Sequence, residues 1–274
     1  MIPTHESNQT SKKEIIVNQL KQLNDYDFNA AHRHNYFEFF YFIKGGGTHK
    51  IDFIDFPIKE GSVHIVGPGQ VHQMNRALCS EGFVFLFELN ALEAPVQIEN
   101  FLFEHICLDA TENNPTFTFY KDQHSILEQK AKTIWRLHKE NSDLSTLALR
   151  NEIHAFCIAC MKQEKTITPV KSSQYMAFRK LLHANFSTMK KVKDYAKALT
   201  ISERSLNEVV KKNTGKSASA IIYRQITMEA KRLLNTRMSI KETAYSLNFD
   251  DPGHFSKFFK TQTGLAPSEF QKLK

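Results

Sequence analysis

The chain has 274 residues, which suits two domains better than one, because compact domains usually hold roughly 100 to 150 residues. Its hydrophobic fraction of 41% and charged fraction of 24% are those of a globular protein and exclude a fibrous or wholly disordered chain. The formal charge of +7 is unevenly placed: residues 170–274 contain 20 Lys and Arg against 8 Asp and Glu, whereas residues 1–169 contain 16 against 21. The basic part suits a polyanion, although a solvated basic surface explains its charge equally well.

The sequence shows no signal for a membrane or for export. No apolar run approaches the roughly 20 residues that a membrane-spanning helix needs, and residues 1–13 lack the apolar stretch of a secretory signal. The spacing of Cys79, Cys107, Cys157 and Cys160 fits neither a disulfide framework nor a four-ligand zinc site. We therefore expect a cytoplasmic protein with no membrane partner, and we interpret the C-x-x-C of Cys157 and Cys160 as part of a buried helix face.

Strand patterns dominate the first half of the chain. Between residues 28 and 119, short aromatic and β-branched runs such as FEFFYFI and SVHIVGP are separated by Gly, Pro and Asp. Long helical periodicity is absent there, so the sequence predicts a small β-barrel or sandwich. We assign residues 1–165 to this first domain, a β-barrel with flanking helices.

The resemblance to cupin barrels depends on two motifs. His32, His34, Glu38 and Gly45 match the first, H-x-H-x3-E-x6-G, although the glycine expected before it is missing. The second is looser, because the spacing from Pro68 to His72 is one residue shorter than the usual P-x-G-x-x-H. A complete cupin site would surround one divalent metal with His32, His34, Glu38 and His72.

These motifs leave two interpretations of the barrel. In the first, the chain is a cupin metalloenzyme fused to the basic second domain, and elemental analysis would reveal its metal. In the second, which we favour because the motif is inexact, residues 1–165 are a cupin-like sensor and dimerisation domain. Their barrel is then a pocket for a small-molecule effector, with no metal, no other cofactor and no enzymatic activity. The expected lining comes from inward-facing residues of the aromatic strands, which could also simply fill a core: His34, Phe37, Phe39, Tyr41 and His72.

Helical spacing begins at His124 and predicts two amphipathic helices. One apolar face contains Ile126, Ala131, Ile134, Trp135 and Leu137, and the other contains Leu144, Leu147, Ile153, Phe156 and Cys160. We expect these helices, between His124 and Met161, to cover the barrel or to pair two subunits in a homodimer. Residues 163–173 have few large apolar side chains and one proline, so we interpret them as the interdomain linker.

Residues 166–274 contain an internal repeat. Three residues return 49 positions later: Lys211, Thr214 and Gly215 recur as Lys260, Thr263 and Gly264. Upstream the shift is 48, since Ala196 recurs as Ala244 and Leu199 as Leu247. The one-residue difference falls between two predicted helices, where a turn absorbs it. Each copy is therefore predicted to be a helix-turn-helix unit.

Capping residues support this prediction. In the second copy Ser239 and Glu242 form a capping box, Asn248 ends the first helix in a left-handed conformation, and Asp251 with Pro252 opens the second. Between the copies, residues 217–235 predict a long helix. Such a spacer would present the two second helices about one DNA turn, roughly 34 Å, apart for successive major grooves.

The motif IKETAYSLNFDDPGHFSKFFKTQTGLAPSEFQ, Ile240 to Gln271, closely resembles the AraC/XylS family of transcription regulators, and the likeness extends over residues 192–274. It implies an all-α DNA-binding domain of two helix-turn-helix units joined by a long linker helix. It also implies double-stranded DNA as partner and a role at promoters, usually activation, where RNA polymerase is a further partner. Family members commonly carry glycine at the position of Asn248.

The exposed residues early in each second helix are the candidate DNA contacts. The first copy offers Arg204, Ser205, Asn207 and Glu208 for base edges and Lys211 and Lys212 for phosphates. The second copy offers Gly253, His254, Ser256, Lys257 and Lys260, which we expect to contact mainly phosphates. Arginine pairs with guanine and asparagine with adenine, so Arg204 and Asn207 are the strongest candidates; the alternative is ordinary helix surface.

The sequence thus predicts a sequence-specific DNA-binding transcription regulator, an activator that responds to a small-molecule effector. Two alternatives stay open: the cupin metalloenzyme described above and an architectural DNA binder that ignores sequence. Competition with random DNA separates the architectural binder from a regulator.

Overall fold

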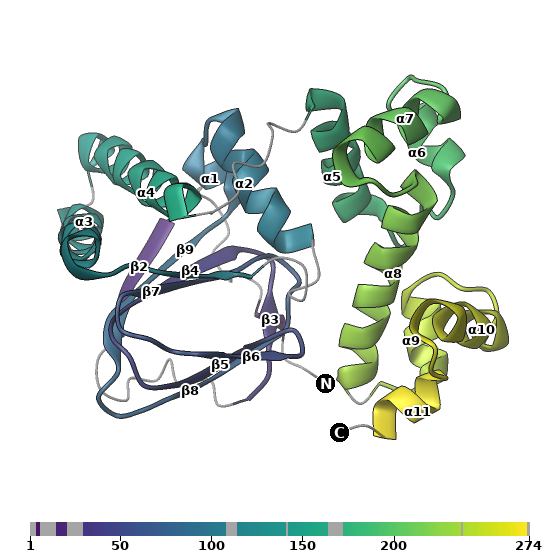
Figure 1. Cartoon of the computed structure of the whole chain (residues 1–274), viewed down its shortest axis with the longest axis horizontal. Coiled ribbons are helices and arrows are strands. Elements are labelled where there is room, and N and C mark those ends of the chain that lie inside the picture. The colour runs from purple at the N-terminus through teal and green to yellow at the C-terminus, as the bar shows by residue number, and fades with distance from the viewer. Residues whose placement is uncertain are drawn as a thin grey trace. The chain divides into compact units, whose positions relative to one another are not determined.

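The computed structural model describes residues 4–5, 15–20, 30–107, 114–140, 142–163, 172–236 and 238–272. The chain divides into two compact units, Ile2–Ile167 and Thr168–Lys274 (Figure 1). The first is rich in β-strands and the second is helical, which confirms the predicted fold class. Among the helices of these residues, none combines the length and the apolarity that crossing a membrane requires.

Two facing sheets form the frame of the first unit (Figure 1). The larger, antiparallel sheet has the strand order β10-β7-β4-β9-β2, with β2 Ile15–Leu20, β4 Phe37–Lys44, β7 Ser62–Val66, β9 Glu81–Phe87 and β10 Thr116–Thr118. The smaller has the order β6-β5-β8, with β5 Gly47–Ile51, β6 Ile54–Pro57 and β8 His72–Arg76. A short parallel pair joins β1 Thr4–His5 to β3 Arg33–His34.

Strand β4 is buried on both faces. Its odd-numbered side chains, Phe37, Phe39 and Tyr41, belong to the core cluster that also contains buried residues of four covering helices. Its even-numbered side chains, Phe40 and Phe42, belong to a second cluster between the sheets. Successive side chains of a strand point to opposite faces, so this single strand separates the two cores.

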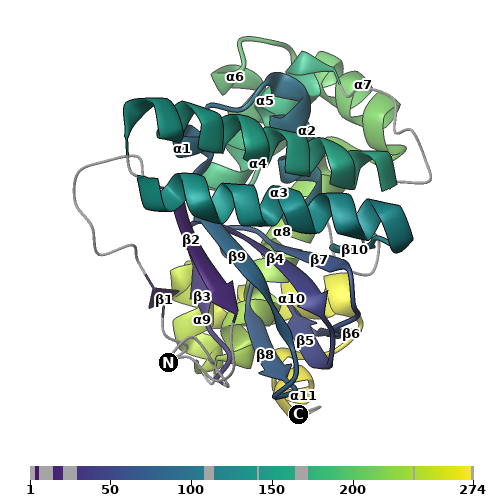
Figure 2. The same ribbon diagram turned by 90° about the vertical axis from the view of Figure 1, so that its left-hand side faces the viewer.

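Helices cover the outer face of the larger sheet. They are α1 Leu89–Leu92, α2 Val96–Cys107, α3 Lys121–Glu140 and α4 Asp143–Gln163. Helices α3 and α4 lie side by side across the strands (Figure 2). The two predicted apolar faces differ in part from the structure, because Ile126, Leu144 and Leu147 stay exposed, whereas Ile153 and Phe156 are fully buried.

The second unit repeats a pair of helices. Its elements are α5 Ser173–Asn185, α6 Val192–Ala198, α7 Glu203–Thr214, α8 Ala218–Asn235, α9 Ile240–Ser246, α10 Pro252–Thr263 and α11 Pro267–Lys272. Both ends of α9 lie 48 positions after those of α6, and both ends of α10 lie 49 positions after those of α7. The structure confirms the predicted repeat. It also confirms that the second copy has its extra residue in the turn between α9 and α10.

Local capping explains where these helices begin and end. The Ser239 hydroxyl accepts a hydrogen bond from the Glu242 amide at 3.1 Å, and Glu242 accepts one from the Ser239 amide at 2.8 Å. Asn248 has a φ of 51°, which confirms the predicted left-handed end of α9. Thr200, its counterpart in the first copy, has a φ of 58°. A β-branched residue seldom adopts this conformation, so the first turn is the more strained of the two.

Helix α8 links the two pairs, with α6 and α7 at one end and α9 and α10 at the other (Figure 1). Leu206 and Val210 fix α7 to the core, and Phe255 and Phe259 do the same for α10; all four are fully buried. Since α7 and α10 bury only one face each, their opposite faces are left for solvent or for a ligand.

Candidate functional site

The exposed face of α7 carries the clearest candidate for contact with a base. The Arg204 side chain is 90% exposed, and its Nε lies 3.0 Å from Oε1 of Glu208 one turn later. This ion pair holds the guanidinium on the outer face of the helix without burying it. Lys211 and Lys212 follow on the exposed surface of the last turn.

The side chain of Asn207 makes hydrogen bonds within the second unit. Its Nδ2 donates to the carbonyl oxygen of Glu203 at 3.1 Å, and its Oδ1 accepts from the amide of Ala218 at 3.1 Å. Ala218 is the first residue of α8, so the Asn207 amide joins α7 to the linker helix. Both ends of the side chain are engaged, and the structure gives it a role in holding the joint. The contact of Asn207 with adenine stays a prediction.

The corresponding face of α10 has different chemistry. Gly253, His254, Lys257 and Lys260 are exposed. Ser256 is half-buried, and its hydroxyl donates to the carbonyl oxygen of Pro252 at 2.8 Å. This helix therefore presents two lysines and a histidine, which suit phosphate oxygens.

The eleven predicted DNA contacts fall into two groups by exposure. Exposed are Arg204, Glu208, Lys211, Lys212, Gly253, His254, Lys257 and Lys260; half-buried are Ser205, Asn207 and Ser256. Each half-buried residue makes a hydrogen bond inside its own unit, in the case of Ser205 through its amide to the Ser202 hydroxyl. The exposed group remains as the candidate surface.

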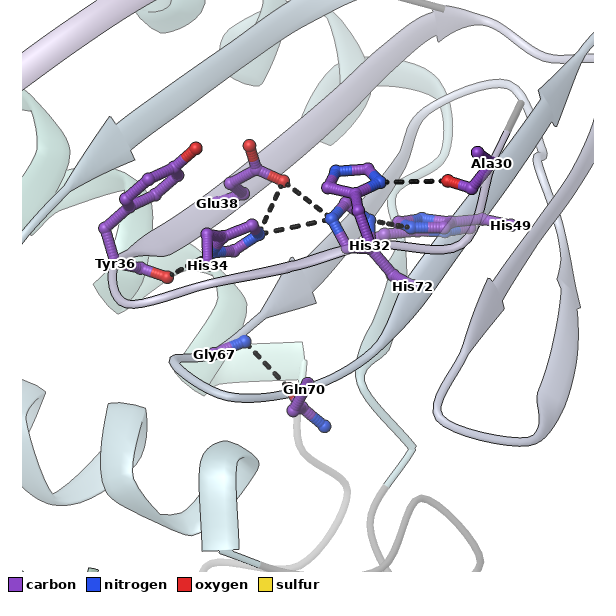
Figure 3. A network of polar contacts seen from close by, with 10 residues as sticks. Ala30, His32, His34, Tyr36, Glu38, His49, Gly67, Gln70 and His72 are labelled. Carbon is purple, nitrogen blue, oxygen red and sulfur yellow. Dashed lines mark hydrogen bonds and ion pairs between the residues drawn. The ribbon is translucent and has the colours of Figure 1, made fainter. Parts of the chain in front are cut away.

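A second candidate site lies between the sheets of the first unit. The Nε2 atom of His34, Oε2 of Glu38 and Nε2 of His72 form a triangle with sides of 3.0, 3.2 and 3.3 Å. Figure 3 shows these three side chains pointing toward one another. All three are buried, and they could hold a metal ion. His32, the fourth residue of the predicted set, lies outside this triangle, with its ring 4.2 Å from the His72 ring between centroids.

More histidines extend this site across the interior. His72 Nδ1 lies 3.1 Å from His49 Nε2, and His49 Nδ1 lies 3.2 Å from His64 Nδ1. His64 Nε2 then meets the Ser62 hydroxyl at 3.3 Å. We call His34, Glu38, His49, Ser62, His64 and His72 the histidine cluster. Burial lowers the pKa of His49 and His72 well below the usual value and that of His64 to about 3, because the charged ring loses its hydration.

The predicted effector residues divide between the two faces of the larger sheet. His34 and His72 lie in the interior, whereas Phe37, Phe39 and Tyr41 pack on the helix side, where the Phe156 ring lies 5.8 Å from that of Tyr41. The sequence analysis expects these three aromatic residues to point into the space between the sheets. In the structure they point to the helix side, because β4 is buried on both of its faces.

The sequence interpretation did not include His49, Ser62 and His64. Two of them, Ser62 and His64, stand two positions apart on β7, and His49 stands two before Ile51 on β5. This spacing places polar groups on the inward face of a strand. A search for polar side chains at alternate positions would have found them.

Two family models match the chain. A model of the AraC-like ligand binding domain matches residues 19–153, and a helix-turn-helix domain model matches residues 195–273. The chain belongs to the AraC family of transcription regulators. The histidine cluster lies inside the first matched segment, and α7 and α10 lie inside the second.

Several named proteins are similar to this AraC-family chain. The uncharacterized HTH-type transcriptional regulator YfiF of Bacillus subtilis is 24% identical over 251 residues, covering 88% of this chain and 78% of YfiF. The HTH-type transcriptional activator RhaS of Enterobacter sp. is 22% identical over 259 residues, covering 88% and 87%. Among solved structures, ToxT from Vibrio cholerae aligns over 95% of this chain and 98% of its own, with 14% identity and a TM-score of 0.43.

Proposed function

We propose that this AraC-family regulator recognises a specific operator with α7 and fixes itself to the DNA backbone with α10. Residues 166–274 are the DNA-binding domain in this proposal, and residues 1–165 are the sensor and dimerisation domain. The observation that supports it most strongly is the repeat: two helices 49 positions apart bury the same apolar positions and leave the opposite face exposed. Two such helices suit two neighbouring major grooves.

Arg204 is the proposed base-reading residue. Its guanidinium is exposed and held by Glu208, so one planar fork of donors is presented to a groove before DNA arrives. A bidentate pair with a guanine is the contact that this geometry favours. Lys211, Lys212, Lys257 and Lys260 are proposed to contact phosphates.

A small-molecule effector is proposed to regulate the protein, since residues 19–153 match a ligand-binding domain. His34 and His72 are its proposed contacts, because they lie between the sheets. Phe39 and Tyr41 instead join the larger sheet to Phe156 of α4, and Phe37 packs on Phe87 of β9 in the same core. Phe39 and Tyr41 are placed to pass a change in the sheet to α4, provided that the effector favours one of two arrangements by its affinity.

A homodimer is proposed to form through α4. Leu144, Leu147 and Ile158 are exposed, and their spacing puts them on one stripe of this helix. Such a stripe suits a second copy of the same helix. Sedimentation of the full chain tests this pairing: a dimer that Leu147→Lys dissociates supports it, and a strictly monomeric wild type removes it.

Activation of transcription is proposed because the relatives named RhaS are activators. Contact with RNA polymerase would follow from that role. Action in the cytoplasm is proposed as well, and the buried thiol of Cys157, which forms no disulfide, is consistent with it.

Selection of binding sites from random DNA by the full chain tests the proposed function. Enrichment of one sequence, with a preferred base that changes in the Arg204→Ala variant, is the expected result. Binding of all sequences alike would instead make the protein an architectural DNA binder. The metalloenzyme alternative is not favoured, since the relatives are transcription regulators.

A further inference from the structure

The hydrogen bonds around the histidine cluster determine which ring nitrogens carry protons. At one end, His34 Nδ1 lies 2.7 Å from the carbonyl oxygen of Tyr36. A carbonyl oxygen only accepts, so the proton is on Nδ1. An imidazole that binds a metal carries a single N–H, and with that proton on Nδ1 the Nε2 atom of His34 presents its lone pair toward Glu38.

Hydrogen bonds at the other end of the cluster determine, in the same way, which ring nitrogen of His72 carries the proton. The Ser62 hydroxyl donates to the carbonyl oxygen of Lys59 at 2.7 Å, so it accepts from Nε2 of His64. His64 Nδ1 then accepts from Nδ1 of His49, and His49 Nε2 accepts from Nδ1 of His72. When each ring carries one proton, this chain of hydrogen bonds leaves Nε2 of His72 with a second lone pair.

Two lone pairs and a carboxyl oxygen thus converge within 3.0 to 3.3 Å. The three atoms repel one another unless a positive charge, from a proton or from a metal ion, lies between them. A metal about 2.1 Å from each of three ligand atoms separates them by about 3.0 to 3.4 Å at octahedral to tetrahedral angles. The observed triangle fits this range.

We propose that the first unit binds one divalent transition-metal ion through His34 Nε2, Glu38 Oε2 and His72 Nε2. Two imidazoles and one carboxylate suit Zn²⁺, Mn²⁺ or Fe²⁺ better than Mg²⁺, which prefers oxygen ligands alone. The carbonyl of Tyr36 and the chain of His49, His64 and Ser62 are the outer groups that orient the two ligand rings. This replaces the expectation of a metal-free domain and, at His34 and His72, the proposed direct contact with an effector; it does not depend on DNA binding.

Metal content and titration of the full chain test the proposal. Protein stripped with a chelator is titrated with Zn²⁺, and one ion for each chain is expected. Glu38→Gln keeps the size of the side chain and adds an amide donor for the lone pairs, so it is expected to fold without metal and to lose at least about 100-fold in affinity. The matched control is His154→Gln, since His154 is a half-buried histidine of α4 bonded to the carbonyl of Leu92; it is expected to bind as wild type does.

Three results would overturn the proposal. They are a wild type that binds no Zn²⁺, as a proton shared among the three atoms would produce; binding that Glu38→Gln leaves unchanged; and tight binding of Mg²⁺ in place of Zn²⁺. Should Glu38→Gln fail to fold, X-ray absorption of the zinc-loaded wild type decides. Two imidazoles with oxygen ligands are expected, and a sulfur ligand or an all-oxygen shell contradicts the assignment.

The outer groups have a separate test. Ser62→Ala removes the acceptor for His64 and frees the tautomers of the chain, so we expect Zn²⁺ affinity to fall about 10- to 100-fold. The visible spectrum of the Co²⁺-loaded protein is expected to shift, which a purely structural loss would not cause. Unchanged affinity together with an unchanged spectrum would remove the positioning role.

Discussion

The two helix-turn-helix units have the same helices and expose different side chains. Where α7 has the ion pair of Arg204 and Glu208, α10 has Gly253 and Lys257 at the corresponding positions. A Cβ atom on Gly253 would lie 2.8 Å from Oδ1 of Asp251, so a larger side chain there would require the Asp251 carboxylate, which caps α10, to shift. The comparison teaches that the repeat preserves how a helix is held in place, while the residues that can contact DNA have diverged.

Among the differences between the two units, the largest expected effect is the loss of base discrimination when Arg204 is removed. Arg204→Ala should reduce discrimination at one base pair by about 1 to 3 kcal/mol, because it removes a bidentate contact. Titration of the selected DNA and of its single-base variants measures this. Lys257→Ala, on the other unit, is the control and should leave that base preference in place. If Arg204→Ala discriminates between bases as the wild type does, α7 has no base-reading role that α10 lacks.

The hydrogen bond that joins α7 to α8 should make substitutions in the first helix-turn-helix unit cost more stability than the matching substitutions in the second. Asn207→Ala is expected to lower the free energy of unfolding by about 1 to 2 kcal/mol, since it leaves the amide of Ala218 without its side-chain acceptor. Its counterpart Ser256 only bonds its own helix, and Pro267, at the position of Ala218, has no amide hydrogen. Ser256→Ala should therefore change stability little. Equal losses in chemical denaturation would contradict this account.

Substitutions in the turns of the two units are expected to change the free energy of unfolding by less, and to raise it. Thr200→Gly should raise the free energy of unfolding by up to about 1 kcal/mol, because glycine adopts a positive φ without the strain of a β-branched side chain. Asn248→Gly should gain less, since asparagine tolerates this conformation. Thermal unfolding of both variants measures the pair. A destabilised Thr200→Gly would show that the side chain of Thr200 matters more than its backbone.

The phosphate contacts should show the smallest change and the least difference between copies. Lys260→Ala is expected to weaken binding to every sequence by about threefold and to lower the slope of affinity against salt by about one. Lys211→Ala, its counterpart, should do the same. Filter binding over a range of salt concentrations tests both. A loss confined to one sequence would mean that the lysine contacts a base.

Much of the second unit was predictable, because the signals are local. The shift of 48 and then 49 positions located four helices, and Ser239, Asn248 and Asp251 marked where helices end or begin. Each of these residues acts on backbone groups a few positions away, so spacing along the chain is enough. The role of Asn207 was not predictable, since its partner Ala218 lies 11 positions away on another helix.

The first unit was harder to predict for a physical reason. The run FEFFYFI is apolar on both faces of β4, so it lacks the alternation that tells which side faces inward. Phe37 and Phe39 were therefore assigned to the interior, which Glu38 and Phe40 occupy. The histidine cluster forms only when β5, β7 and β8 meet, and no single stretch of sequence contains it.

Hydroxyl-radical footprinting of the full chain on its selected operator tests the central claim most directly. The account predicts two protected patches about one helical turn apart on one face of the DNA. Arg204→Ala should alter the sequence preference under one patch, and Lys257→Ala should weaken protection at the other. A single protected patch, or two patches that both variants affect alike, would contradict the proposal that α7 and α10 enter neighbouring grooves with different tasks.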